Sequence, residues 1–170
     1  MIQGFTIETL APTHQRARFH CASPSLDDFI HKRAKAHNAN DTTRVHVLAD
    51  RSGRIAGFYT LSAHMLELHG LPESIQKGRP RFPVPATLIG RFAVDHEFAG
   101  KGVGRWLLAH ALRTAHAADR LVGSAIVVLD LAPDAAPSAQ ELYASVGFIC
   151  LQSTPRRMIL PMETIARSFP

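Results

Sequence analysis

The sequence lacks long apolar runs. Its 170 residues contain no uninterrupted stretch of about 18 apolar residues, which a membrane-spanning helix requires. The opening segment, Met1 to Leu10, lacks the basic region and apolar stretch that mark a secretory signal peptide. Internal repeats, low-complexity tracts and linker-like segments are missing as well. These absences predict a single cytoplasmic domain over residues 1–170, with no membrane partner.

Cysteine and metal-binding patterns are scarce. Cys21 and Cys150 stand alone, without the C-x-x-C spacing of redox and zinc sites. We expect both thiols to be reduced and buried as small apolar side chains. The ten histidines include no pair at metal-ligand spacing; His64 and His69, for example, do not share a helix face. The sequence therefore predicts no metal cofactor.

The charge is unbalanced toward the basic side. The formal net charge is +5 and the sequence pI is about 9.8, and arginine carries most of the excess. Such a balance suits a polyanionic partner. Hydrophobic residues make up 46% of the chain, which is enough for a substantial core.

The most informative stretch runs from Arg91 to Leu108 and predicts a strand, a glycine loop and a helix. Phe92 to Val94 is a short apolar run typical of a buried strand. Three alternating glycines come next, and they allow a tight turn and close approach to a ligand. The helix after them has one apolar face. Its N-terminus would offer unpaired N–H groups and a positive dipole end to an anion such as phosphate. The residues concerned are Gly100, Gly102 and Gly104 in the loop and Val103, Leu107, Leu108, Ala111, Leu112 and Ala115 on the helix face.

This loop does not match two common phosphate-binding patterns. Lys101 is not followed by Ser or Thr, so the loop is not a nucleoside-triphosphate P-loop. The third glycine comes too early for the dinucleotide fingerprint. A plain glycine turn before a core helix stays open as the simpler interpretation.

The remaining pattern predicts an α/β (α+β) fold with a mixed, mostly antiparallel central sheet and helices on both faces. A helix is expected to start at Ser25, with Leu26, Phe29, Ile30 and Ala34 on its inner face. A hairpin comes after it, and its turn contains Gly53. Between the hairpin and the next strand lies a basic loop with a helical turn after Pro72. The expected strands cover residues 2–10, 44–49, 55–65, 86–94, 125–131, 148–151 and 157–160, with helices ending near 118 and containing 143.

A second motif lies between Ser138 and Phe148. The segment S-A-Q-E-L-Y-A-S-V-G-F reads as a helix that ends in Tyr143, Gly147 and Phe148. A capping glycine and a packing tyrosine would explain it without any function. Together with the glycine loop, however, it resembles the GCN5-related N-acetyltransferases (GNAT), which bind acetyl-coenzyme A. Ala99 departs from the Gln or Arg usual in that family's loop, and Leu142 stands where Phe is common.

The resemblance covers nearly the whole chain and implies a splayed pair of central strands that holds acetyl-CoA as cosubstrate. It implies that the pantetheine arm pairs with strand backbone, that a backbone N–H near Val94 polarises the thioester carbonyl, and that Tyr143 is the general acid. The implied cofactor-binding residues are Phe92, Ala93, Val94, Ala99, Gly100, Lys101, Gly102, Val103, Gly104, Arg105 and Ser138.

Four further segments are similar to the acetyltransferase toxins of type II toxin–antitoxin systems. They are F-H-C-A-S-P-S-L-D-D-F-I, I-A-G-F-Y-T-L-S, F-P-V-P-A-T-L-I-G-R-F-A-V-D and R-M-I-L-P-M. This similarity implies acetylation of the α-amino group of aminoacyl-tRNA, arrest of translation, and a small ribbon-helix-helix antitoxin as partner. Phosphate contacts would come from basic residues, for which the candidates are Lys32, Arg33, Lys35, Lys77, Arg79, Arg81 and Arg91.

The chemistry agrees with such a substrate. An α-amino group has a pKa of about 8, against about 10.4 for lysine, and esterification should lower it further. Such an amine is largely neutral at cell pH and needs no strong base. The Tyr143 hydroxyl, with an ordinary pKa of about 10, can protonate the departing thiolate.

Two other functions stay open, as does a homodimer. The first is a small-molecule amine N-acetyltransferase, which would favour an acidic pocket rather than a basic loop. The second is a non-catalytic module that binds coenzyme A or a partner protein, although Tyr143 argues against it.

Overall fold

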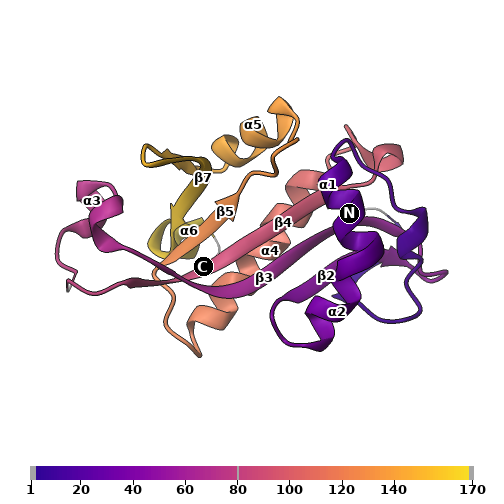
Figure 1. Cartoon of the computed structure of the whole chain (residues 1–170), viewed down its shortest axis with the longest axis horizontal. Helices are drawn as coiled ribbons and strands as arrows, with labels where there is room; N and C mark the ends of the chain where they lie inside the picture. Colours follow the sequence, from indigo (N-terminus) through magenta and orange to yellow (C-terminus); the bar gives the residue numbers. More distant parts are fainter. Residues whose placement is uncertain (1–2, 80, 169–170) are drawn as a thin grey trace.

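The computed structural model describes residues 3–79 and 81–168, so Ile2 of the expected first strand lies outside the described part. A seven-stranded sheet with the order β1-β2-β3-β4-β5-β7-β6 runs through the molecule (Figure 1). Neighbouring strands are antiparallel except β4 and β5, which are parallel. The expected mixed, mostly antiparallel sheet is confirmed. The strands are β1 Phe5–Thr9, β2 Arg44–Asp50, β3 Ile55–Leu66, β4 Val84–Val94, β5 Ile126–Asp130, β6 Ile149–Leu151 and β7 Thr154–Pro161.

Helices cover both faces of the sheet, as expected. In Figure 1, α1 and α2 lie in front of the sheet and α4 lies behind it. The described helices are also too short or too polar to cross a membrane. The α-helices are α1 Pro24–Asp28, α2 Ala34–Ala39, α3 Glu73–Gln76, α4 Val103–Asp119, α5 Pro137–Ser145 and α6 Met162–Ser168, and the short helical turns are η1 Arg16–Arg18, η2 Phe29–Arg33, η3 Leu68–Gly70 and η4 His96–Phe98.

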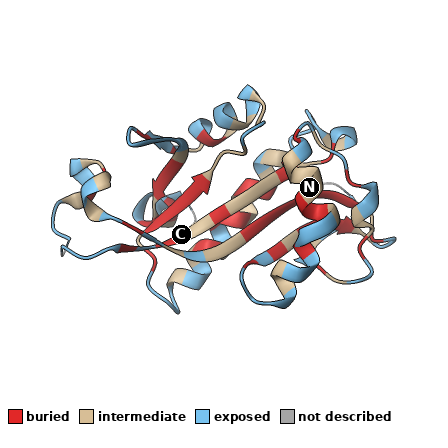
Figure 2. Ribbon diagram, viewed as in Figure 1, coloured by how far each residue is buried: buried red, intermediate tan, exposed pale blue. Residues whose placement is uncertain are grey.

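The core consists of three apolar clusters, which include the buried strand segments coloured red in Figure 2. The largest packs α4, α5 and α6 against one sheet face, with Leu107 and Leu108 fully buried. The second packs α1, η2 and α2 against the other face through Phe29 and Ile30. The third lies under α3. The largest cluster includes residues of the central strands β3, β4 and β5, so these strands are held firmly where the site lies.

The first helical segment starts two residues earlier than expected, so the assignment of Ser25 as its start was wrong. Ser23 is the N-cap and accepts a hydrogen bond from the Leu26 N–H. Pro24 suits the first helical position because its missing N–H is not needed there. The Ser25 hydroxyl donates instead to Asp134, in the loop before α5.

One other expectation fails, and one helix was not predicted. Cys150 is exposed and Cys21 is only partly buried, so the prediction of two buried thiols was wrong. Cys150 lies on the short strand β6 at the edge of the sheet, where its thiol accepts a hydrogen bond from Gln140 on α5 but stays exposed. Helix α6 was not expected, because it is a short segment directly after Pro161.

Candidate active site

The site begins where β4 and β5 separate. The two strands pair from Ala86 with Ile126 to Ile89 with Leu129, whereas β4 continues to Val94 (Figure 1). Beyond Ile89, the edge of β4 that faced β5 is therefore open.

Hydrogen bonds identify the groups on this open edge. The Arg91 N–H donates to the Thr60 hydroxyl at 3.0 Å, and the Asp95 N–H donates to the Ala56 carbonyl at 2.9 Å. Both acceptors belong to β3. Backbone groups of successive strand residues point in opposite directions. The N–H groups of Phe92 and Val94 therefore point away from β3, into the gap where β5 has diverged. This edge can pair with an extended ligand, as the predicted pantetheine site requires.

A cavity of about 270 Å³ occupies the gap. One wall is the end of β4 and another is the glycine loop. The remaining walls come from the segment between β5 and α5, from α5 itself, and from the chain around the start of α1. The lining residues are Cys21, Ala22, Ser23, Leu26, Arg91, Phe92, Ala93, Val94, Ala99, Gly100, Gly104, Asp130, Leu131, Ala132, Ala135, Ala136, Ser138, Ala139, Leu142 and Tyr143.

The glycines of the loop have two different roles. Gly100 and Gly102 have φ of 73° and 78°, in the left-handed region that side chains disfavour. A Cβ on either would meet open space, so the loop leaves room for a ligand. Gly104 instead lets α4 approach α5, because its Cβ would lie 3.3 Å from Leu142 Cδ2. The expected strand, loop and helix are confirmed, with Gly102 as the N-cap of α4.

The structure brings most of the predicted cofactor residues to the cavity, namely Phe92, Ala93, Val94, Ala99, Gly100, Gly104 and Ser138. The other four do not line it. The Val103 side chain is buried in the core, and the Lys101 ammonium lies 5.9 Å from the centre of the Phe98 ring. The Arg105 side chain borders a separate groove between α4 and α6. Gly102 and these three residues can therefore contribute only backbone groups or more distant charge.

Tyr143 lines the cavity and is almost fully buried. Its ring meets Phe92 edge-to-face at 5.7 Å and Phe148 at 6.2 Å, which fixes its orientation. Burial raises the pKa of the Tyr143 hydroxyl above its ordinary value of about 10. The hydroxyl is therefore neutral at cell pH and can act as a proton donor.

Arg91 is the one predicted substrate-contacting residue that lines the cavity. Its guanidinium lies 4.1 Å from the centre of the Phe29 ring, and burial, followed by the charge of Arg33, lowers its pKa. Within the described residues it forms no ion pair with a carboxylate. Its charge beside the cavity is thus available to an anionic ligand.

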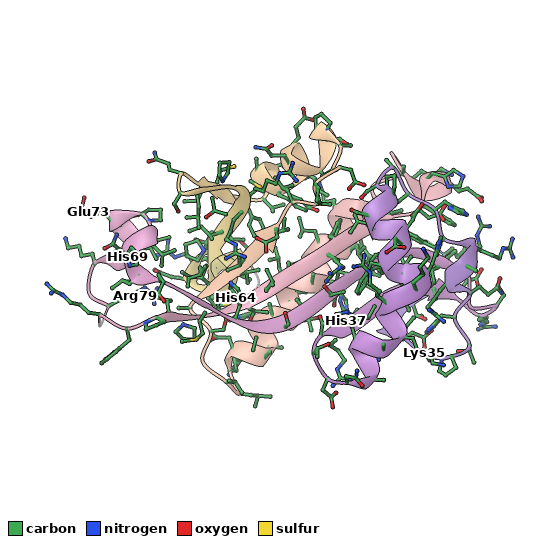
Figure 3. All side chains as sticks on the ribbon, in the orientation of Figure 1. Lys35, His37, His64, His69, Glu73 and Arg79 are labelled. Atoms are coloured by element: carbon green, nitrogen blue, oxygen red, sulfur yellow. The ribbon has the colours of Figure 1, made fainter. Side chains whose placement is uncertain are left out.

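The other predicted basic residues lie farther away. Lys32 and Arg33 both pair with Asp28. Figure 3 shows Lys35 and Arg79 at opposite ends of the long axis of the molecule. The basic residues of η2 and α2 (the α2 group: Lys32, Arg33 and Lys35) and those at and after the end of α3 (the α3-loop group: Lys77, Arg79 and Arg81) therefore lie far apart, and only a large ligand could contact both.

Sequence reasoning missed the lining residues Asp130 and Cys21. Asp130 is the polar residue that ends the buried strand β5, and this position was the one signal that could have identified it. Sequence reasoning also missed Asp134. In the structure its carboxylate accepts hydrogen bonds from Ser23 Oγ at 2.5 Å and from the Ser25 N–H at 2.9 Å. These bonds join two walls of the cavity and hold the pKa of Asp134 at about 2.

Comparison with known proteins decides the family. A family model described as an acetyltransferase (GNAT) domain matches residues 41–150. The chain belongs to the GNAT acetyltransferases. This GNAT chain is an acetyl-CoA-dependent N-acetyltransferase, and the expected fold and enzyme class are confirmed.

Two relatives of this GNAT enzyme are named as toxins. A probable toxin TacT of Sinorhizobium fredii is 36% identical over 167 residues, covering 94% of this chain and 92% of the relative. A tRNA-acetylating toxin of Mycobacterium tuberculosis is 34% identical over 146 residues, covering 85% and 84%. The resemblance to the acetyltransferase toxins is confirmed.

Solved structures agree with this similarity. AtaT complexed with acetyl-methionyl-tRNAfMet has a TM-score of 0.88 at 28% identity and covers 98% of this chain and 99% of that one. A tyrosine-to-phenylalanine mutant of AtaT, bound to acetyl-CoA and the C-terminus of the antitoxin AtaR, has a TM-score of 0.83 at 24% identity, with 98% of each chain covered. At 24% identity, the second comparison shows only that the two chains share a fold.

Proposed function

We propose that this enzyme transfers the acetyl group of acetyl-CoA to the α-amino group of aminoacyl-tRNA and thereby blocks translation. The observation that carries the proposal is the cavity that joins the open β4 edge, the glycine loop and the Tyr143 side chain. Relatives named for tRNA acetylation support the choice of substrate.

Acetyl-CoA fits the site. Bound acetyl-CoA supplies an activated thioester, and the space beside Gly100 and Gly102 accommodates its pyrophosphate at the positive end of α4. The N–H groups of Phe92 and Val94 pair with the pantetheine arm and polarise the carbonyl. The transfer needs no metal.

The chain's own groups then complete the transfer. The neutral α-amine attacks the carbonyl carbon, so that a C–N bond forms and the C–S bond breaks. Tyr143 gives its proton to the sulfur, and the amine nitrogen releases a proton that returns to Tyr143 through solvent. Because burial raises the pKa of Tyr143, its hydroxyl holds the proton until thiolate develops beside it.

The front face of the sheet receives the acceptor stem. Arg91 contacts a phosphate near the acylated ribose, while the α2 and α3-loop basic groups contact the stem on either side. In the cell, a ribbon-helix-helix antitoxin binds the enzyme and prevents this use of tRNA.

The test is transfer of radiolabelled acetyl to total charged tRNA and to a panel of free amines, at low and moderate salt. We expect label on charged tRNA, a steep fall of the rate with salt, and growth arrest when the protein is expressed without its partner. Replacing both Arg79 and Arg81 by Glu should weaken tRNA use and leave acetyl-CoA binding nearly intact. Label on a free amine but none on tRNA would replace this proposal by small-molecule acetylation.

A further inference from the structure

Asp130 is the one carboxylate among the described residues that line the cavity. It ends β5 at the point where β4 has turned away. The other titratable lining residues are Cys21, Arg91 and Tyr143. Burial raises the pKa of both Cys21 and Tyr143, so that each is neutral at cell pH, and Arg91 is cationic. Asp130 is thus the group in the cavity that can attract an ammonium ion.

The Asp130 carboxylate is held in a fixed orientation from outside the cavity. Arg157, on β7, donates from Nε to Oδ1 at 2.7 Å and from its terminal nitrogen to Oδ2 at 2.8 Å. Such a two-point contact fixes the plane of the carboxylate. Both side chains are partly covered, with 37% of Asp130 and 22% of Arg157 exposed.

His64 in turn holds Arg157. Another terminal nitrogen of Arg157 lies 3.1 Å from His64 Nε2, on β3. Burial, followed by the charge of Arg157, lowers the pKa of His64, so the ring is neutral and its Nε2 accepts the hydrogen bond. Figure 3 shows His64 on the sheet, between the ends marked by Arg79 and Lys35. The carboxylate is therefore anchored through three strands.

The acceptor amine needs a partner in this cavity. Aminoacyl-tRNA carries an α-ammonium group in equilibrium with the amine, and the nearby Arg91 repels it. A carboxylate gives an ammonium a charge-assisted hydrogen bond and keeps it beside the reacting centre. We propose that Asp130 binds the α-amino group of the acceptor and that Arg157 is its positioning residue. The assignment rests on the proposed function, because it names how that substrate's amine is recognised.

Recognition of the amine is thereby separate from recognition of RNA. Asp130 should contribute to binding of charged tRNA and nothing to binding of uncharged tRNA, which lacks the ammonium. It should also favour the ammonium form and raise the pKa of the bound amine. Replacing a residue with only a structural role would change neither the preference for charged over uncharged tRNA nor the pKa of the bound amine.

The first test compares Asp130→Asn with the wild type in two binding measurements. The ligands are a tRNA carrying a stable aminoacyl amide and the same tRNA uncharged, both with coenzyme A present. We expect the affinity for the aminoacyl form to fall about 10- to 100-fold, the range for a hydrogen bond to a charged group, and the affinity for uncharged tRNA to be unchanged. Glu141→Gln, on the exposed side of α5, is the matched control and should change neither.

The second test follows kcat against pH. In Asp130→Asn the alkaline-rising limb should move to lower pH, because loss of the carboxylate lowers the pKa of the bound ammonium. The titratable groups around Asp130 are unaltered in this variant; they are Arg157, which bonds it, His64, which contacts Arg157, and Cys21, Arg91 and Tyr143, which line the same cavity. Arg157→Lys keeps the charge but loses the two-point contact, so it should show a partial loss of preference for charged tRNA.

The outcomes distinguish this proposal from the proposed function. Equal losses of affinity for charged and uncharged tRNA in folded Asp130→Asn, or an unmoved pH limb, would overturn the role of Asp130. If the wild type labels only free amines and Asp130→Asn raises KM for them, the proposed substrate fails while the amine-binding role stands. Thermal melting of both variants checks that they fold.

Discussion

The Thr60 hydroxyl accepts the backbone N–H of Arg91 at 3.0 Å, at the irregular register between β3 and β4. Thr60 is almost fully buried, with 1% of its surface exposed. The register shift inserts an extra residue into β4, which bends the strand and re-aims the strand residues beyond it. This one contact therefore helps to set the open β4 edge that faces the cavity.

Thr60→Val should reduce both stability and activity. Valine keeps the shape but leaves a buried N–H unsatisfied, at a cost of about 1–3 kcal/mol. Urea unfolding and acetyl transfer measure the two effects. Thr9→Val, on the exposed part of β1, is the control and should change neither. A wild-type unfolding midpoint in Thr60→Val would show that the register shift does not depend on this hydroxyl.

Tyr143→Phe should lose about 10²- to 10⁴-fold in turnover while keeping its affinity for acetyl-CoA. The substitution removes the proton donor and leaves the ring contact with Phe92 in place. Tyr59→Phe removes the other buried tyrosine hydroxyl, which bonds His110 on α4 and does not line the cavity, and should leave turnover intact. Steady-state kinetics and calorimetry measure these effects; unchanged turnover in Tyr143→Phe would place the acid elsewhere.

Gly102→Asp should weaken acetyl-CoA binding by more than ~10-fold in calorimetry. A side chain at φ of 78° is strained by about 1–2 kcal/mol, and the carboxylate would repel pyrophosphate at the start of α4. Gly78→Asp is a matched control, because Gly78 has the same φ and equally open space in the loop after α3. Equal losses in the two variants would mean that backbone strain alone, rather than the ligand site, is responsible.

Arg91→Met should raise KM for charged tRNA and reduce the slope of log affinity against log salt by about 1, the value for one lost phosphate contact. Its acetyl-CoA affinity should change little, because methionine can still pack on the Phe29 ring. Arg51→Met, in the exposed β2–β3 turn, is the control. An unchanged salt slope in Arg91→Met would contradict a phosphate contact at this position.

Stability should fall as pH drops from about 6.5 toward 4. Burial, followed by the charges of His110 and Arg44, lowers the pKa of His46 from 6.5 to about 4. In this window the unfolded chain binds a proton that the folded chain does not, so stability increases with pH. Urea midpoints at several pH values should show this slope, and His46→Gln should flatten it. An equal slope in the variant would assign the effect to other groups.

The strand, glycine loop and helix of the proposed cofactor site could be predicted from local sequence. Alternating glycines followed by an apolar helix face indicate a tight turn and the start of a helix. Both features depend on residues that are close in the sequence, because positive φ and an unpaired helix N-terminus are local backbone properties. The same holds for Tyr143 and Gly147, at the end of one short helix. These local motifs carried the resemblance to the acetyltransferase family, which is confirmed, and that resemblance implied Tyr143 as the acid, which stays a prediction.

Which polar groups meet at the cavity could not be predicted from local sequence. Asp130 and Arg157 are 27 positions apart, and Ser23 and Asp134 are 111 apart. Such pairs depend on strand order and on where β4 leaves β5, which no local periodicity encodes. The seven basic residues proposed to contact tRNA show the same limit of local sequence. They could be selected as basic, but only the packing of the chain shows that Arg91 alone among them lines the cavity. Long-range register and burial, rather than residue type, selected the groups that can act on a substrate.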